Sequence, residues 1–206
     1  MTAPTAQPAR DRPRTEALIR AAARDVLAET GFQGFGVNAV ARRAGCDKQL
    51  IYRYFGGLEG LVDAIGADLA TWLEDSLAAA PTPAPASYAQ LSERLILGFL
   101  DAFRANRLVQ QIALWELADP SPLVARLAQA RSAGLIRWMA RARGDLARPT
   151  GVDAPALNAL LIAALQQLAL SAAATGAFAG LNLSTDADWT RVRETATAVI
   201  RGAYRE

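Results

Sequence analysis

The chain has 206 residues, of which 52% are hydrophobic and 20% charged, a composition typical of a folded globular protein and not of a disordered one. One cysteine and no histidine exclude an internal disulfide, Cys/His zinc sites and histidine-based acid–base catalysis. The net charge is +2, but the first 56 residues carry +4 and the remainder −2. This asymmetry favours contact with nucleic acid near the N-terminus.

Residues 1–13 are rich in Pro, Ala and Arg and are expected to form a disordered basic arm. The arm can follow a phosphate backbone or simply lie in solvent, and the sequence leaves both open. It has no apolar core of a secretory signal, so a cytoplasmic protein is expected. A helix is predicted from Arg14 to Thr30, ended by Gly31, and the two phenylalanines that follow are expected to fill a small N-terminal core.

Gly36 to Phe55 has the pattern of a helix-turn-helix, two short helices joined by a tight turn. Gly36 can cap the first helix, and Gly45 follows its last apolar residue, where a helix end often has a positive φ. Asp47 can cap the second helix. Cys46 is expected to lie in the corner between the helices, in preference to acting as a redox sensor.

The outward face of the second short helix suits a DNA groove. Lysine and glutamine can reach base edges, while tyrosine and arginine can reach phosphates. The predicted DNA-binding residues are Asn38, Lys48, Gln49, Leu50, Tyr52, Arg53 and Tyr54. The alternative, a helical hairpin packed in a core, is disfavoured because glycine, cap and aromatic positions all agree.

The run from Ala44 to Phe55 resembles TetR-type transcriptional regulators. In that family a helix-ending Ala-Gly precedes an apolar residue, a capping residue and a short recognition helix that ends in aromatic-x-aromatic-Phe. Further matches, to the ends of the family's first helix and to its fourth helix, are Thr30, Gly31, Phe32, Glu59, Leu61 and Ile65. The specific resemblance covers roughly the first third of the chain.

Two positions depart from the family pattern. Gly36 stands where the family usually has Thr, and Leu58 stands where Lys is common, which removes a hydroxyl and a cation that could contact phosphate. The helical patterns and the resemblance together predict an all-α fold of about nine helices. An N-terminal three-helix DNA-binding domain is expected at 14–57, and a ligand-binding and dimerisation domain at 58–206.

The remaining helices are predicted from apolar residues at helical spacing. A loop is expected at 81–85, where three prolines fall within five residues, and no segment has the alternation of a strand. Asp186 is expected to cap the last helix. The predicted ranges are 58–79, 87–106, 108–118, 122–146, 154–179 and 186–204.

The segment Ala154–Ala179 is nearly apolar all round, but it is interrupted by Asn158, Gln166, Gln167 and Ser171. A helix buried between two subunits is therefore favoured over a membrane span. A second apolar stripe on the last helix is formed by Val192, Ala196 and Val199. The resemblance implies a homodimer in which the last two helices of each copy pair into a four-helix bundle.

Polar side chains on otherwise apolar helices point to a ligand site beside aromatic residues, although each aromatic alone is more often part of a core. The predicted ligand-binding residues are Phe99, Phe103, Gln111, Trp115, Trp138, Met139, Asn158 and Gln166. The ligand is expected to wedge between the 58–79 helix and Phe99, Phe103 or Trp115.

The sequence thus predicts a transcriptional repressor that binds a palindromic operator in double-stranded DNA and is released by a small, largely apolar effector. The alternative is an all-helical small-molecule-binding protein or enzyme whose helical hairpin is incidental. The enzyme interpretation lacks a recognisable catalytic set, and no catalytic residue, metal, cofactor or membrane contact is predicted.

Overall fold

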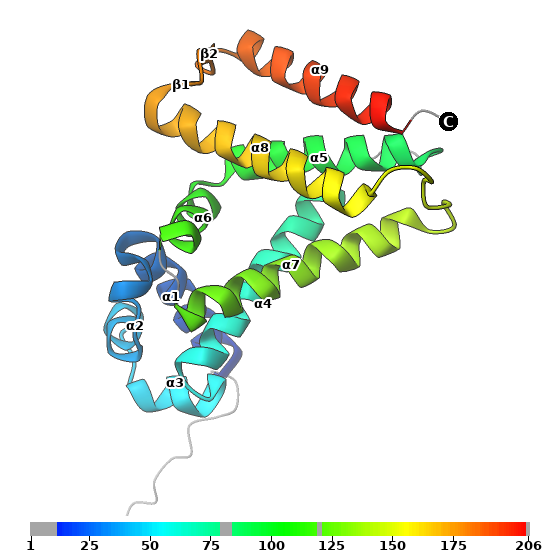
Figure 1. The fold of residues 1–206 in the computed structure, drawn as a ribbon. Coiled ribbons are helices and arrows are strands. Elements are labelled where there is room, and N and C mark those ends of the chain that lie inside the picture. Colours follow the sequence, from blue (N-terminus) through cyan, green and yellow to red (C-terminus); the bar gives the residue numbers. More distant parts are fainter. Residues whose placement is uncertain (1–11, 79–83, 119–120, 205–206) are drawn as a thin grey trace, which may run out of the picture. The chain divides into compact units, whose positions relative to one another are not determined.

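The computed structural model describes residues 12–78, 84–118 and 121–204 (Figure 1). Within these ranges it has nine helices and one short hairpin, which confirms the predicted all-α fold of about nine helices. The elements are α1 (Arg12–Gly34), α2 (Val37–Ala44), α3 (Lys48–Phe55), α4 (Leu58–Ala78), α5 (Tyr88–Ala105), α6 (Arg107–Ala118), α7 (Pro122–Arg143), α8 (Ala154–Thr175), β1 (Ala177–Phe178), β2 (Leu181–Asn182) and α9 (Asp186–Ala203). Most of the predicted basic arm and most of the predicted proline-rich loop lie outside the described residues.

The chain divides into two compact units. The N-terminal unit consists of the described residues up to Leu69 together with Gln111–Arg131, and the C-terminal unit consists of Ala70–Gln110 together with the described residues from Ser132 onward. The divisions fall inside α4, α6 and α7, so each of these helices contributes residues to both units. The functional boundary expected after residue 57 stays a prediction.

The core of the N-terminal unit forms where α1 packs against α2. Ile19 and Ala23 of α1 are fully buried, as are Val40 of α2 and Ile51 of α3. Phe32, in the last turn of α1, and Phe35, just after the helix, fill this core as predicted, with their rings in an edge contact at 6.4 Å. Helix α1 begins at Arg12, two residues earlier than predicted.

Gly31 interrupts α1, as predicted, although helical turns resume on its far side and reach Gly34. Its backbone has φ 63° and ψ −169°, a conformation that is essentially restricted to glycine. The indole ring of Trp115, on α6 of the same unit, lies against it, and a Cβ at residue 31 would be 2.7 Å from that ring. Glycine is therefore required here both by the backbone and by the packing.

We expect Gly31→Ala to lower the free energy of unfolding by about 2–4 kcal/mol, because backbone strain and overpacking against Trp115 add together. Urea denaturation followed by circular dichroism measures this. Gly202→Ala is the matched control, since Gly202 lies in α9 with nothing within 4 Å of the added carbon, and it should be neutral or slightly stabilising. A Gly31→Ala protein as stable as the wild type would contradict the assignment.

Small residues let α4 and α7 approach closely within each unit. In the N-terminal unit, Gly66 lies against Ala130, and in the C-terminal unit Gly134 lies against Ala70. Ion pairs also join the two helices. Arg126 binds Asp63 in the N-terminal unit, and Arg141 binds Glu74 in the C-terminal unit.

The C-terminal unit is built on α5, which packs against α8 and α9 (Figure 1). Its buried face includes Leu91, Leu95 and Leu100, each at most 1% exposed. Phe99 and Phe103 are also buried, and their rings stack at 5.5 Å. These two predicted ligand-binding residues are therefore part of the hydrophobic core of this unit.

The end of α8 corrects the sequence prediction in two ways. The helix stops at Thr175, where Gly176 caps it with φ 74°, and does not continue to Ala179. The residues beyond form an antiparallel hairpin, in which Ala177 pairs with Asn182 and Phe178 with Leu181. The expectation of no strand is therefore wrong, because two-residue strands are too short to produce a visible alternation.

The start of α9 is also corrected. Thr185, and not Asp186, caps the helix through a capping box with Asp188. Hydrogen bonds from the hydroxyl and the backbone N–H of Thr185 lower the pKa of the Asp188 carboxyl. Trp189, Val192, Ala196 and Ile200 are buried, so most of the stripe predicted for a partner subunit is already used inside the protomer.

Candidate nucleic-acid interface and ligand cavity

Helices α2 and α3 form the predicted helix-turn-helix, and their caps explain its shape. Gly45 ends α2 with φ 65°, and its N–H donates to the carbonyls of Ala41 and Arg42. Asp47 caps α3 by accepting the backbone N–H of Gln49 at 2.8 Å. Gly36 is the N-cap of α2 and offers no side-chain hydrogen bond, in keeping with the hydroxyl that the sequence lacks at this position.

The buried side of α3 rests on Ile51, and its polar side chains lie outward. Lys48, Gln49 and Arg53 are exposed, and Tyr52 is 56% exposed with its ring beside Gly57. No acidic side chain among the described residues pairs with Lys48 or Arg53, so both cations are free to meet phosphate or base edges. Their roles in DNA binding stay predictions.

The other predicted DNA-binding residues differ in their surroundings. Asn38 is exposed on α2, whereas Leu50 and Tyr54 are only half-buried on α3. The Arg12 guanidinium lies over the ring of Tyr54, 5.3 Å from its centroid, and so joins the start of α1 to this helix. Arg12 also pairs with Glu16 at 2.6 Å.

Two neighbouring arginines at the end of α2 were not singled out by the sequence, and the structure separates them. Arg43 is bound to the carboxylate of Glu29 and lies 3.8 Å from Asp25, both on α1. Arg42 is exposed without an acidic partner among the described residues. Arg42 is therefore a further candidate for a phosphate contact, and only the adjacent basic pair in the sequence hinted at it.

Cys46 lies in the turn of the helix-turn-helix and is half-buried. Burial, with a smaller effect from the Asp47 carboxylate, raises the pKa of its thiol. A raised pKa keeps the group protonated and unreactive at neutral pH. This agrees with the structural role expected for Cys46.

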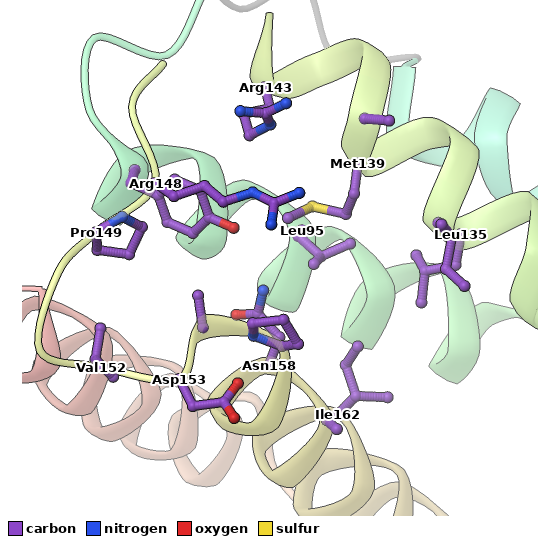
Figure 2. Close-up of a pocket in the computed structure, with 16 residues that line it drawn as sticks. Leu95, Leu135, Met139, Arg143, Arg148, Pro149, Val152, Asp153, Asn158 and Ile162 are labelled. Atoms are coloured by element: carbon purple, nitrogen blue, oxygen red, sulfur yellow. The ribbon is translucent and has the colours of Figure 1, made fainter. Parts of the chain in front are cut away.

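A cavity of about 610 Å³ lies within the C-terminal unit (Figure 2). It is framed by α5, the second half of α7, the segment between α7 and α8, and the start of α8. Its volume and mostly apolar walls are typical of small-molecule sites. The residues around it are Tyr88, Leu95, Leu135, Ile136, Met139, Ala140, Arg143, Arg148, Pro149, Val152, Asp153, Ala154, Pro155, Asn158, Ala159 and Ile162.

Of the eight predicted ligand-binding residues, the cavity brings together Met139 and Asn158. Trp138 is buried beside Met139 on α7 without lining the cavity, and Gln166 is half-buried farther along α8. Gln111 and Trp115 belong to the N-terminal unit. Sequence patterns missed the two arginines of the cavity because Arg143 ends a helix rich in arginine and Arg148 lies in an irregular segment.

Asn158 is 93% buried, and its contacts are specific. Its side-chain Oδ1 accepts the hydroxyl of Ser92 at 2.6 Å. The two N–H groups of its amide have no acceptor among the described residues. Asp153, at the start of α8, accepts the backbone N–H of Ala156 at 3.0 Å and thereby caps that helix.

Comparison with known proteins agrees with this geometry. Residues 19–65, which include the helix-turn-helix, match the family model of bacterial regulatory proteins, tetR family. No curated protein is significantly similar to the chain.

Solved structures of low sequence identity share the fold along nearly the whole chain. The multidrug binding protein EbrR, complexed with imidazole, has a TM-score of 0.63 at 20% identity, with 100% of this chain and 98% of EbrR covered. A putative TetR family regulator from Vibrio parahaemolyticus has a TM-score of 0.63 at 20% identity, with 89% of this chain and 97% of that chain covered. FadR from Bacillus subtilis, in complex with stearoyl-CoA, has a TM-score of 0.60 at 15% identity, with 89% of this chain and 96% of FadR covered.

The helical fold and the helix-turn-helix together support a DNA-binding regulator. Residues 19–65 match the model of the tetR family, and the described residues have the fold of solved TetR-family regulators. The resemblance found in the sequence is therefore confirmed.

Proposed function

We propose that this protein is a cytoplasmic transcriptional repressor that binds a palindromic operator as a dimer and leaves it when a small, largely apolar ligand occupies the C-terminal unit. The observation that carries the proposal is α3, a capped helix that presents Lys48, Gln49 and Tyr52 outward. A helix of this kind reads the major groove through its first turns.

Selection of bound duplexes from a random DNA pool tests the proposal directly. A near-palindromic consensus with two half-sites separated by about one helical turn, or a multiple of it, is the expected result. Enrichment of no sequence, or of a single half-site without symmetry, would overturn the dimeric operator. The repressor role is then tested by placing the selected operator in a promoter.

A dimer is proposed because α8 exposes apolar residues. The helix is long and apolar enough to cross a membrane by length and composition alone, but core helices of soluble proteins pass the same test. Only 22% of its most apolar window is buried within the protomer. Leu160 is 69% exposed, and Ala156, Ala163 and Ala164 are exposed on the same helix. A partner copy that covers this face removes it from water.

The ligand proposal starts from the cavity in the C-terminal unit. Its aliphatic lining suits an apolar molecule, and the similarly folded EbrR and FadR are described with bound small molecules. The cavity is lined by no residue of α4 and by neither Phe99 nor Trp115. We therefore place the ligand against α7, and not in a wedge beside α4.

Helix α7 offers a route for coupling between ligand and DNA. Its second half lines the cavity through Leu135 and Met139. In the N-terminal unit, its Arg126 donates two hydrogen bonds to Asp63 of α4, at 2.5 and 2.6 Å, and one to Glu59 at 3.0 Å. The hydrogen bonds from Arg126 to Asp63 lower the pKa of the Asp63 carboxyl. A ligand that displaces α7 would therefore also move α4, because the ion pairs of Arg126 join the two helices.

We expect Arg126→Gln to weaken the coupling between an effector and the operator, by several-fold in the affinity ratio measured with and without effector. Stability should change little, since the pair is at the surface and solvent screens it. Fluorescence anisotropy of labelled operator, titrated with an effector found through tryptophan fluorescence, measures the ratio.

Arg201→Gln is the matched control for this experiment. Arg201 forms a similar surface pair with Glu93, which joins α9 to α5 and does not involve α7. It should leave the coupling unchanged. Equal coupling in the wild type and the Arg126→Gln protein would show that the signal does not pass through this ion pair.

A further inference from the structure

Most of the lining of the cavity is apolar. Leu95, Leu135, Met139 and Ile162 supply aliphatic and thioether surface from three helices, as Figure 2 shows. These side chains offer neither charge nor a strong hydrogen-bonding group. They suit the hydrocarbon part of a ligand and do not discriminate among head groups.

The charged part of the cavity is predominantly cationic. Arg143 ends α7, and Arg148 reaches over the cavity from the segment that follows it (Figure 2). The one carboxylate in the lining, Asp153, already caps α8 through the N–H of Ala156. Arg143 donates a weak hydrogen bond to the carbonyl of Leu146 at 3.3 Å. No described residue pairs with the Arg148 guanidinium, so it is available to a ligand.

The buried polar group at the cavity is a donor. Because the Oδ1 atom of Asn158 accepts the Ser92 hydroxyl, its amide N–H groups are left for another acceptor. Arginine also donates and never accepts. The amide of Asn158 and the guanidinium of Arg148 thus both offer donors, and the guanidinium adds a positive charge, which together suit a carboxylate or phosphate oxygen.

We propose that the cavity binds an amphipathic anion, with its hydrocarbon body against Leu135 and Met139 and its anionic head held by Arg148 and the amide of Asn158. This inference deepens the proposed function, on which its regulatory meaning rests. A cationic head would face two arginines, and a neutral one would leave the donors without a charged acceptor.

Binding of four probes with the same alkyl chain tests the inference: decanoate, decyl phosphate, decanol and decylamine. The full-length protein is titrated without DNA, by calorimetry or by the fluorescence of its tryptophans, of which Trp138 adjoins Met139. At least one of the two anions should bind about tenfold or more tightly than decanol and decylamine, as expected for a charge-assisted hydrogen bond. The two anion arms distinguish a carboxylate from a phosphate head.

Arg148→Gln should lower the affinity for the preferred anion about tenfold and leave decanol binding unchanged. Arg148 is exposed in an irregular segment, so the variant should fold. Arg137→Gln, which alters an exposed arginine of α7 outside the cavity, should change neither. Equal binding of all four probes, preference for decylamine, no binding of either anion, or full anion affinity in a folded Arg148→Gln protein would each overturn the inference.

The outcome is separable from that of the proposed function because DNA is absent from the titration. An anion that binds through Arg148 but leaves operator affinity unchanged would contradict ligand-induced release and support the anion site. Release of the operator by a neutral compound, with no anion binding, would support ligand-induced release and contradict the anion site.

Discussion

Replacing Lys48, Gln49 and Tyr52 together by alanine is expected to lower the affinity for the selected operator at least a hundredfold and to remove the preference for it over random DNA. The three side chains are exposed on α3, where each well-made base contact contributes about 1–3 kcal/mol of discrimination. Their removal leaves the buried Ile51 and the Asp47 cap in place. Anisotropy titrations at one fixed salt concentration measure the change.

Single replacements distinguish contacts to base edges, which set sequence preference, from contacts to phosphate, which do not. Lys48→Ala should relax the preference at one base position, whereas Arg53→Ala should weaken all sequences alike and reduce the slope of affinity against salt. Arg191→Ala, at an exposed arginine of α9, is the control for lost charge alone. Undiminished operator binding by the folded triple variant would rule out α3 as the recognition helix.

Ala164→Arg is expected to convert the proposed dimer to a monomer and to abolish most operator affinity. Ala164 is exposed on α8 near Leu160, so a charged side chain there would be buried without a partner at a two-fold interface. A monomer holds one half-site only and loses the gain from binding two linked sites. Sedimentation at micromolar concentration and operator titration measure the two effects.

Ala125→Arg provides the comparison, because Ala125 is an exposed alanine of α7 in the N-terminal unit. It should leave the oligomeric state unchanged. A wild-type protein that sediments as a monomer would refute the dimer itself, and a dimeric Ala164→Arg protein would move the interface away from this face of α8.

The helix-turn-helix is predictable from sequence because its features are local. Gly45 and Asp47 act on backbone groups within a few residues of themselves, and the outward position of Lys48 and Gln49 follows from helical periodicity around Ile51. The core position of Phe32 and Phe35 is also predictable from the sequence. Apolar periodicity, together with glycine and proline positions, also predicted most helix boundaries to within a few residues.

Local sequence does not show which element packs against an apolar helix face. Val192 and Ala196 were expected to face a second subunit, but both are buried within the protomer, at 7% and 5% exposure, on a helix that packs against α5. Periodicity shows that a face is buried and leaves open what buries it. The same holds for Phe99 and Phe103, whose stacked rings form core where an aromatic ligand wall was predicted.

The sequence by itself determined the helical class, the helix-turn-helix and the residues on its exposed face, because propensity, caps and periodicity act over a few residues. Only the tertiary structure decided which arginines are free. Arg42 and Arg43 are equivalent in sequence, yet Glu29 neutralises only Arg43. In the same way, Arg148 gains its position over Leu95 and Met139 only when the chain folds, since ion pairs and cavities join residues whose distance along the chain carries no signal.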